Sequence, residues 1–387
     1  MNKRYGIVAI GYNRPDSMKR LLNALNEAEF GGRQALLIIS LDYAGMPEMS
    51  ELAEDYKWKH GEKVVIAYPE RQGLRGHVLQ CGDYLEKYNL DAMAVFEDDV
   101  FPSPAFFNYM VQAVDFYGDC EEIAGISLYT HLWNEVYSMP FQPLYGGSDV
   151  YFMQYAQSWG QIWLPAQWKE FKKWYQEHSE NFSEAEGVPS AVSRWKDSSW
   201  LKYHIRYCVE KNKYFVYPYE SLATNFTEIG THNQYRTALY QVPLQIDAQK
   251  RYRFGLLDDK QSVVYDAFFE NTKIAEVLGI PSEELCVDLY GSKPDTKKEK
   301  YWLTTRYADY GLEKSFGLSL RPQELNVLLN IPGTEIKLYN LSCHKDEKKG
   351  DSLTDYQFFD YYYRLTHARW KRLAKFLLEK IKMRIKK

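Results

Sequence analysis

The sequence has 387 residues, enough for roughly two to three domains, and its 45% hydrophobic and 26% charged content excludes wholesale disorder. The net charge of −4 provides no overall field that would attract nucleic acid. Five scattered cysteines without a CxxC pair favour neither a disulfide scaffold nor a zinc ribbon, and they fit a reducing, cytoplasmic location. No apolar run approaches the ~18–20 residues that a membrane-spanning helix needs.

Strands alternate with helices over about the first 100 residues. Continuous apolar runs are typical of buried strands, and apolar residues repeated at helical spacing predict helices between them. We therefore predict a mostly parallel sheet that helices cover on both faces. The predicted strands are 5–10, 35–41, 63–67 and 92–96, and the predicted helices begin at Pro15 and span 49–56 and 77–88.

The alternation continues less regularly to about residue 243, and the sequence then changes to short strands separated by turns. Further helices are predicted over 101–117, 171–178 and 197–211, and further strands over 124–128, 215–218, 286–290, 301–304 and 335–341. The predicted organisation is an α/β domain over 1–243, a smaller α+β extension over 244–362 and a basic amphipathic helix over 363–387.

Polar side chains follow three of the predicted strands at the point where each strand ends. Arg14 follows the first strand, Asp42 follows the second, and Glu97, Asp98 and Asp99 follow the fourth. Ligands of parallel sheets bind beyond the carboxyl ends of the strands, so we expect these groups to meet at one edge of the sheet.

Three adjacent acids after a buried strand repel one another unless a positive charge neutralises them. A divalent cation does so, and Mg²⁺ and Mn²⁺ prefer carboxylate oxygen ligands. A metal that also bridged a diphosphate would stabilise the charge that develops on this leaving group. The alternative is a solvated acidic turn at the start of the next helix, which Pro102 supports and which is favoured for this motif taken alone.

Other candidate residues each have an ordinary structural explanation beside the functional one. Arg14 can bind a carboxylate or a phosphate with both ends of its guanidinium, or form a surface ion pair. Asp42 can accept a hydrogen bond from the imide of uracil, or stabilise a turn. The glycines of 73–77 let backbone N–H groups approach a phosphate, with Arg75 or His77 adding charge, but their spacing is not that of a dinucleotide-binding loop.

An aspartate lies between two tryptophans in the segment 195–200. Tryptophan rings bind sugars, so Asp197 can serve as a general base toward an acceptor hydroxyl, or it can cap the following helix. His232, in a polar loop, can complete a metal shell or be an ordinary surface histidine. For both residues the structural explanation is favoured in isolation.

Taken together and in this order, five segments resemble the GT-A type nucleotide-sugar glycosyltransferases. The sequence is most similar to bacterial family-2-like transferases, and more distantly to the N-acetylglucosaminyltransferase that starts complex N-glycan branches and shares the EDD motif. The resemblance extends over roughly residues 5–235 and implies a Rossmann-like GT-A fold with a mostly parallel central sheet. The segments are 7–25, 37–45, 73–85, 95–110 and 157–171.

The resemblance implies a metal-dependent, inverting transfer of a sugar from a UDP-sugar to a saccharide or lipid-linked saccharide, as in the synthesis of bacterial surface polysaccharides. Mn²⁺ or Mg²⁺ would be the cofactor, bound directly by Asp99, and His232 is the second candidate metal ligand because of its own chemistry rather than the resemblance. Asp197 would be the catalytic base, although Trp-Lys-Asp-Ser-Ser-Trp departs from the family's Trp-Asp-Asp-Trp. The nucleotide would contact Arg14, Asp42, Asp98 and either Arg75 or His77, and the donor sugar or the acceptor would contact Glu97, Trp159 and Gly160.

The end of the sequence is strongly basic, with ten Lys or Arg and one acid between residues 364 and 387. A basic amphipathic helix there predicts peripheral contact with the inner face of a membrane through residues 366–387, which suits a lipid-linked acceptor. Docking onto the acidic remainder of the same chain, or onto a homodimer partner, is the alternative.

Two other classes of protein stay open. A sugar-nucleotide nucleotidyltransferase shares strand-end acids and a parallel sheet, but it would carry a Gly-rich loop with Arg or Lys after the first strand, which GYNRPD lacks. A non-catalytic carbohydrate-binding protein is disfavoured by the intact EDD motif and by Asp197. No nucleic acid partner is expected.

Overall fold

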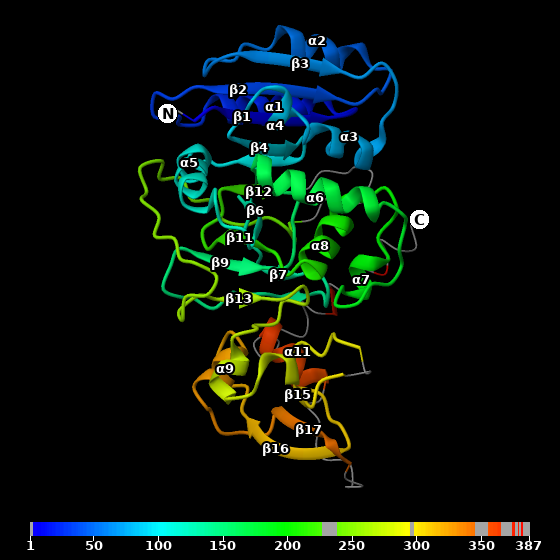
Figure 1. The fold of residues 1–387 in the computed structure, drawn as a ribbon, viewed down its shortest axis with the longest axis vertical. Coiled ribbons are helices and arrows are strands. Elements are labelled where there is room, and N and C mark those ends of the chain that lie inside the picture. Colours follow the sequence, from blue (N-terminus) through cyan, green and yellow to red (C-terminus); the bar gives the residue numbers. More distant parts are fainter. Residues whose placement is uncertain are drawn as a thin grey trace. The chain divides into compact units, whose positions relative to one another are not determined.

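The chain folds into two compact units (Figure 1). One unit contains residues 1–136 and 141–273, and the other contains residues 137–140 and 274–387, so residues 244–273 group with the first unit. The computed structural model describes residues 3–226, 238–294, 298–344 and 355–364, and residues 374, 375, 378 and 381. Most of the predicted basic helix over 363–387 therefore lies outside the described residues.

A mixed sheet forms the centre of the first unit. Within the described part of this unit it has nine strands, in the order β13-β9-β11-β6-β10-β4-β1-β2-β3. β1 pairs in parallel with β2 and β4, and β2 pairs in parallel with β3, which confirms the predicted parallel arrangement. These strands are Tyr5–Gly11 (β1), Ala35–Leu41 (β2), Lys63–Ala67 (β3) and Ala92–Glu97 (β4).

Reversed strands enter the other half of this sheet. β10 lies between β4 and β6 and is antiparallel to both, and β9 is antiparallel to β11. β6 and β11 are parallel, so the sheet as a whole is mostly parallel. The strands are Ile123–Ser127 (β6), Val150–Met153 (β9), Gln161–Trp163 (β10), Tyr214–Pro218 (β11) and Val264–Tyr265 (β13), with Trp133–Asn134 (β7) outside the sheet.

Helices flank the sheet, and several of them begin at a proline. Pro15, Pro47 and Pro165 lie in the first turns of α1, α2 and α6, where the missing N–H of proline costs no hydrogen bond. α1 buries one apolar side, including Met18 and Leu22, in the core that it shares with β1 and β2. The helices are Pro15–Asn26 (α1), Pro47–Asp55 (α2), Gly73–Cys81 (α3), Tyr84–Lys87 (α4), Phe106–Tyr117 (α5), Pro165–Glu177 (α6), Ser190–Ser193 (α7) and Leu201–Glu210 (α8).

The prediction of a helix over 101–117 is wrong at its start. Residues Val100–Pro102 form a short strand, β5, which pairs with Ala223–Asn225 (β12), and α5 begins only at Phe106. The physical reason is the presence of two prolines, because a residue that precedes proline is held in an extended conformation.

The prediction of one helix over 77–88 is also wrong in its bounds. The segment begins four residues earlier, at Gly73, and is divided into α3 and α4. Gly82 stands at the division, and its missing side chain leaves room for the ring of Trp168, because an added Cβ would lie only 1.8 Å from Trp168 Cε2.

The second unit is built on a smaller sheet. Its described residues include a four-stranded sheet in the order β14-β15-β17-β16, with β14 parallel to β15 and the other pairs antiparallel. Leu303, Phe316 and Ile336 are fully buried in its core. The elements are Met139–Pro140 (β8), Ile274–Leu278 (α9), Ser282–Glu284 (η1), Leu285–Asp288 (β14), Tyr301–Thr304 (β15), Tyr310–Phe316 (β16), Glu324–Leu328 (α10), Ile336–His344 (β17) and Asp355–Tyr363 (α11). Over the described ranges, no helix has both the length and the apolar character to cross a membrane.

Candidate functional site at the carboxyl edge of the sheet

The acidic run and Arg14 come together at the ends of β1 and β4. The parallel register pairs Ile10 with Glu97, so the two strands end at the same level. Arg14, which follows β1, donates from Nη2 to Asp98 Oδ1 and lies 3.6 Å from Asp99 Oδ2. Residues from two separate strands therefore form one charged cluster.

Burial makes the charges of this cluster costly. It raises the pKa of Asp98 to about 6, although Arg14 opposes the shift. Burial, followed by repulsion from Asp99 and Asp98, raises the pKa of Glu97 to about 8. For Arg14, burial opposes the charge, but attraction to Asp98 and Asp99 outweighs it and raises the pKa. At neutral pH the cluster therefore retains a proton that a bound cation would displace.

The cluster suits a metal that takes some of its ligands from a substrate. Among the residues that the structure describes, no group of three or more His, Cys, Asp or Glu side chains is placed to hold a metal ion. Mg²⁺ commonly binds through one or two carboxylates and takes its other ligands from water and phosphates. The Asp99 side chain is 26% exposed, whereas that of Asp98 is 5% exposed, so Asp99 is the more accessible to a cation. His232, the other predicted metal ligand, lies outside the described residues.

We expect the free energy of unfolding in metal-free buffer to fall as the pH rises from about 6.5 to about 8. In this range the folded protein keeps a proton on Glu97, whose pKa burial raises to about 8, whereas the unfolded carboxyl has already lost it. The stabilisation that this proton on Glu97 provides is therefore complete at low pH, and it is lost as the pH rises through the pKa of Glu97 in the folded protein. Burial lowers the pKa of His77, His131 and His204, so these neutral histidines oppose the decrease near the lower end of the range, where the unfolded imidazole is still partly protonated. Near pH 8 the imidazole is neutral in both states, and the loss of the Glu97 proton dominates. Urea denaturation at the two ends of the range measures the effect.

Glu97→Gln should reduce this pH dependence, because the amide does not titrate. Burial also raises the pKa of Glu135, a second partly buried acid, to about 8, so Glu135→Gln removes a separate part of the same decrease. Magnesium chloride should stabilise the wild-type protein more at the upper end of the range, where it competes with fewer protons. A free energy of unfolding that increases between these pH values would contradict the raised pKa of Glu97.

Asp42 lies at the start of α3 and in the wall of a cavity. Its Oδ1 accepts a hydrogen bond from the backbone N–H of Gln72 at 2.7 Å, and its Oδ2 accepts one from Gly73 at 3.0 Å. The carboxylate thereby satisfies N–H groups that the first turn of a helix leaves free. The cavity has a volume of about 260 Å³, and it is lined by residues at the carboxyl ends of β1, β2 and β3 and in the first turn of α2.

The two residues that the sequence offered as alternatives, Arg75 and His77, lie in different surroundings. His77 is 2% exposed, its Nε2 lies 2.7 Å from Ser40 Oγ, and its ring packs edge-on against Tyr68. Burial lowers the pKa of His77 to about 4, so the imidazole is neutral at physiological pH. Arg75 extends instead to Asp197. Of the two, Arg75 has side-chain surface to offer a ligand.

The side chains of Asp197 and Arg75 form an ion pair with two hydrogen bonds. Arg75 Nη1 lies 2.9 Å from Asp197 Oδ1, and Nη2 lies 3.3 Å from Oδ2. The Tyr203 hydroxyl donates to Asp197 Oδ1 at 3.0 Å and accepts from Arg75 Nη1 at 2.6 Å. Burial raises the pKa of Glu97, and the side chain of Trp200, three residues after Asp197, interacts with that carboxyl and opposes the rise. This interaction brings the segment that carries Asp197 beside the acidic cluster.

β10 brings Trp159 and Gly160 to the same edge from the opposite direction. Gln161 pairs with Val95 of β4, so the two residues before it lie beside the end of β4. The Trp159 ring packs against Tyr129, with 4.8 Å between the ring centroids. An aromatic surface therefore adjoins the acidic cluster.

Replacing Gly160 by alanine is expected to lower the free energy of unfolding by about 2–4 kcal/mol, from left-handed backbone strain and from crowding. Gly160 has a φ of +94°, and an added Cβ would lie 3.0 Å from Ala223 Cβ and 3.2 Å from Leu128 Cβ. Gly32→Ala is the matched control, because Gly32 has a φ of +76° with nothing within 4 Å of the added atom. Urea denaturation should show a clearly smaller loss for the control, and equal losses would exclude crowding at Gly160.

Tyr203 is not among the predicted site residues, although its hydroxyl contacts both Arg75 and Asp197. No motif marks this residue, which is one of several aromatic residues on α8. The one available signal was helical spacing, since Tyr203 follows Trp200 by three residues and such pairs lie on one side of a helix.

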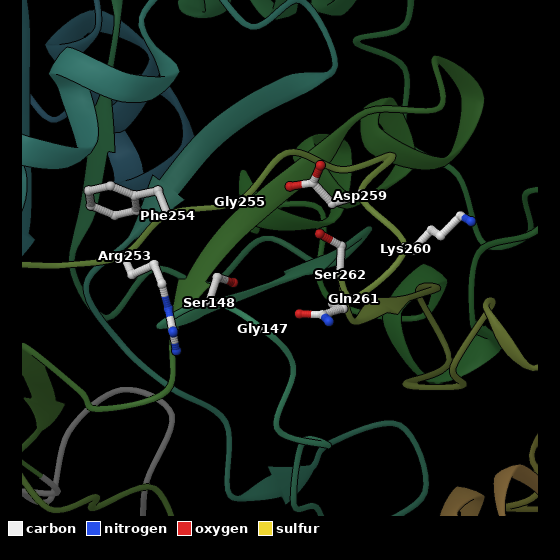
Figure 2. A pocket seen from close by; sticks show the side chains of 9 residues that line it. All are labelled: Gly147, Ser148, Arg253, Phe254, Gly255, Asp259, Lys260, Gln261 and Ser262. Carbon is white, nitrogen blue, oxygen red and sulfur yellow. The ribbon is translucent and has the colours of Figure 1, made fainter.

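A second cavity lies in the same unit, between the loops around residues 147–148 and 253–262 (Figure 2). Its volume is about 360 Å³. Figure 2 shows the side chains of Ser148, Gln261 and Ser262 turned toward a common space and that of Lys260 turned away. The residues that line this cavity are different from those predicted for catalysis or nucleotide binding.

The sequence matches no protein-family model, and it matches no curated protein. Among solved structures, the chain is similar to S. aureus TarS residues 1–349, with a TM-score of 0.37, 8% identity and coverage of 57% of this chain and 59% of that chain. It is also similar to the mannosyltransferase PcManGT from Pyrobaculum calidifontis in complex with GDP-Man and Mn²⁺, with a TM-score of 0.31, 12% identity and coverage of 50% and 51%. The matches thus span little more than half of either solved chain. At these scores they carry no conclusion about function, which has to come from the site itself.

Proposed function

We propose that this protein is a metal-dependent, inverting glycosyltransferase that moves a sugar from a UDP-sugar to a saccharide or lipid-linked saccharide. The observation that carries the proposal is the gathering of the candidate residues along the carboxyl edge of the sheet. Arg14 contacts Asp98 and Asp99, and the side chain of Trp200 interacts with Glu97. Asp197, three residues before Trp200 in the chain, is hydrogen-bonded to Arg75. The candidate metal ligand and the candidate base therefore belong to neighbouring segments.

The uridine would occupy the cavity beside Asp42. Tyr12, Tyr43 and Tyr68 line it, and aromatic rings are surfaces on which a nucleobase can stack. Asp42 Oδ1 already accepts hydrogen bonds from two backbone N–H groups, whereas Oδ2 accepts one and keeps a lone pair for the imide N–H of uracil. The volume of about 260 Å³ suits a nucleobase with part of its ribose.

The diphosphate would lie over the acidic cluster. Asp99 would hold Mn²⁺ or Mg²⁺, and Arg14 would keep Asp98 oriented beside it, toward the ribose. When bound, the metal supplies a positive charge that stabilises the departing diphosphate. Glu97, with which the side chain of Trp200 interacts, would face the donor sugar.

Asp197 would take the proton from the acceptor hydroxyl as that oxygen attacks the anomeric carbon. The new carbon–oxygen bond forms as the bond from the anomeric carbon to the diphosphate oxygen breaks, and the electron pair of that bond leaves with UDP. One such displacement inverts the anomeric configuration. Trp159 would offer a flat apolar face to a sugar ring, and Gly160 would let the chain pass close to β4.

Release of free UDP from a panel of UDP-sugars, assayed with Mn²⁺ and with EDTA, tests this proposal. We expect release that depends on an acceptor and stops with EDTA. A nucleotidyltransferase would instead release pyrophosphate from UTP and a sugar phosphate, and a carbohydrate-binding protein would bind saccharides without turnover. Either of these results would refute the proposed reaction.

A further inference from the structure

The carboxylate proposed as the base is largely occupied by hydrogen-bond donors. Asp197 Oδ1 accepts from Arg75 Nη1 and from the Tyr203 hydroxyl, and Oδ2 accepts from Arg75 Nη2. Each carboxylate oxygen offers about two lone pairs, so Oδ1 is fully engaged and Oδ2 keeps one. A general base needs a lone pair directed at the proton that it removes. In this arrangement Asp197 is therefore held in place but is poorly available to an acceptor hydroxyl.

Arg75 lies where a second anion can compete for it. It is in the first turn of α3, and the backbone of the same turn is fixed to Asp42 at the proposed uridine cavity through Gln72 and Gly73. The side chain of Arg75 is 26% exposed and that of Asp197 is 51% exposed, so solvent and ligands can reach the pair. Guanidinium groups bind phosphate oxygens in the same two-pronged manner as carboxylates.

Tyr203 holds the side chains of Arg75 and Asp197 in position relative to each other. Its ring is fully buried, and the Arg75 guanidinium carbon lies 5.2 Å from the ring centroid. Burial, and next the hydrogen bond to Asp197, raise the pKa of Tyr203 to about 12, so its hydroxyl is a donor across the physiological range. When Arg75 turns away, Tyr203 can still hold Asp197 by this hydrogen bond.

We propose that Arg75 and Tyr203 are positioning residues for Asp197, and that the diphosphate of the donor competes with Asp197 for the Arg75 guanidinium. Donor binding then frees Oδ2, and one lone pair of Oδ1, for the acceptor proton, while Tyr203 preserves the orientation of the carboxylate. The order of events follows, because the base becomes available only after the donor is in place. The inference rests on the function proposed above and adds a coupling between its two substrates.

Competition between the diphosphate and Asp197 for Arg75 predicts that removing the Asp197 carboxylate increases the affinity for the nucleotide, whereas loss of a purely structural contact would not increase it. A nucleotide diphosphate has to break the Arg75–Asp197 pair before it can use Arg75, so removing the carboxylate should make nucleotide binding tighter. An exposed ion pair of this kind corresponds to a change of about 2- to 5-fold in affinity. Loss of a merely structural contact would weaken binding or leave it unchanged.

Isothermal titration of the full chain with UDP and Mn²⁺ tests the inference. We expect Asp197→Asn to bind UDP about 2- to 5-fold more tightly than the wild type, and Arg75→Gln to bind it more weakly. The double variant Arg75→Gln/Asp197→Asn should bind like Arg75→Gln alone. Tyr203→Phe, which keeps the ring and loses both hydrogen bonds of the hydroxyl, should show a smaller increase in affinity than Asp197→Asn.

The double variant separates competition for Arg75 from a general electrostatic effect. If Asp197→Asn tightened UDP binding equally in the Arg75→Gln background, repulsion between Asp197 and the diphosphate would explain the increase, and the inference would be wrong. Unchanged or weaker binding by Asp197→Asn, with normal binding by the wild type, would overturn the inference and leave the proposed transferase function standing. Absence of UDP binding by the wild type would overturn both.

Discussion

Asp99→Ala is expected to reduce sugar transfer by at least about 10²–10³-fold while leaving the fold intact. Asp99 is the accessible carboxylate of the acidic cluster, so its removal takes away the proposed metal ligand. The fold should persist because the residue is partly exposed and because its backbone carbonyl still accepts the N–H of Phe226. UDP release with Mn²⁺ measures the loss of transfer, and circular dichroism with a denaturation curve measures whether the fold is intact.

Asp119→Ala is the matched control for this experiment, because Asp119 is an exposed acid in the turn after α5. It should retain transfer and stability. A binding titration adds a readout that does not depend on turnover: Asp99→Ala should lose most of the increase in UDP affinity that Mn²⁺ gives the wild type. Full activity in Asp99→Ala would remove the basis for metal-dependent transfer at this edge of the sheet.

Asp197→Asn is expected to lower kcat by about 10²–10⁴-fold without weakening donor binding. The amide keeps the size of the side chain and can still accept from Tyr203, but it cannot take a proton from the acceptor hydroxyl. Steady-state kinetics with saturating acceptor, together with the UDP titration described above, separate the loss of chemistry from a loss of affinity. A kcat within about 10-fold of the wild type would assign the base to another residue.

The central sheet was predictable because its signal is local. The run 35–41 is continuous, apolar and fully buried, and the run 63–67 is apolar after Lys63 and mostly half-buried at the edge of the sheet. Short apolar runs of this kind favour strands, and the predicted bounds coincide with β2 and β3. The same logic placed Arg14, Asp42 and the acidic run at strand ends, where the structure has them.

Features that depend on distant partners were not predictable in this way. Pairing of Val100–Pro102 with Ala223–Asn225 joins segments more than 100 residues apart, and the local sequence there resembles the start of a helix. The contact between Arg75 and Asp197 joins residues separated by 122 positions. Sequence reasoning could name both residues as candidates, but it assigned them separate roles because nothing local shows that they touch.

The reversed strand β10 has a consequence for how the specificity of such a protein can change. It lies between β4 and β6 and is antiparallel to both, so it begins at the edge of the sheet where β4 and β6 end. The residues before β10 therefore lie in a loop at the same edge as the acidic cluster. Insertions or deletions in that loop would remodel the surface around Trp159 without shifting the register of β1, β2 and β4. Changes in the loop before β10 can therefore alter which sugar and which acceptor are recognised, while the strands that precede Arg14 and Asp42 stay the same.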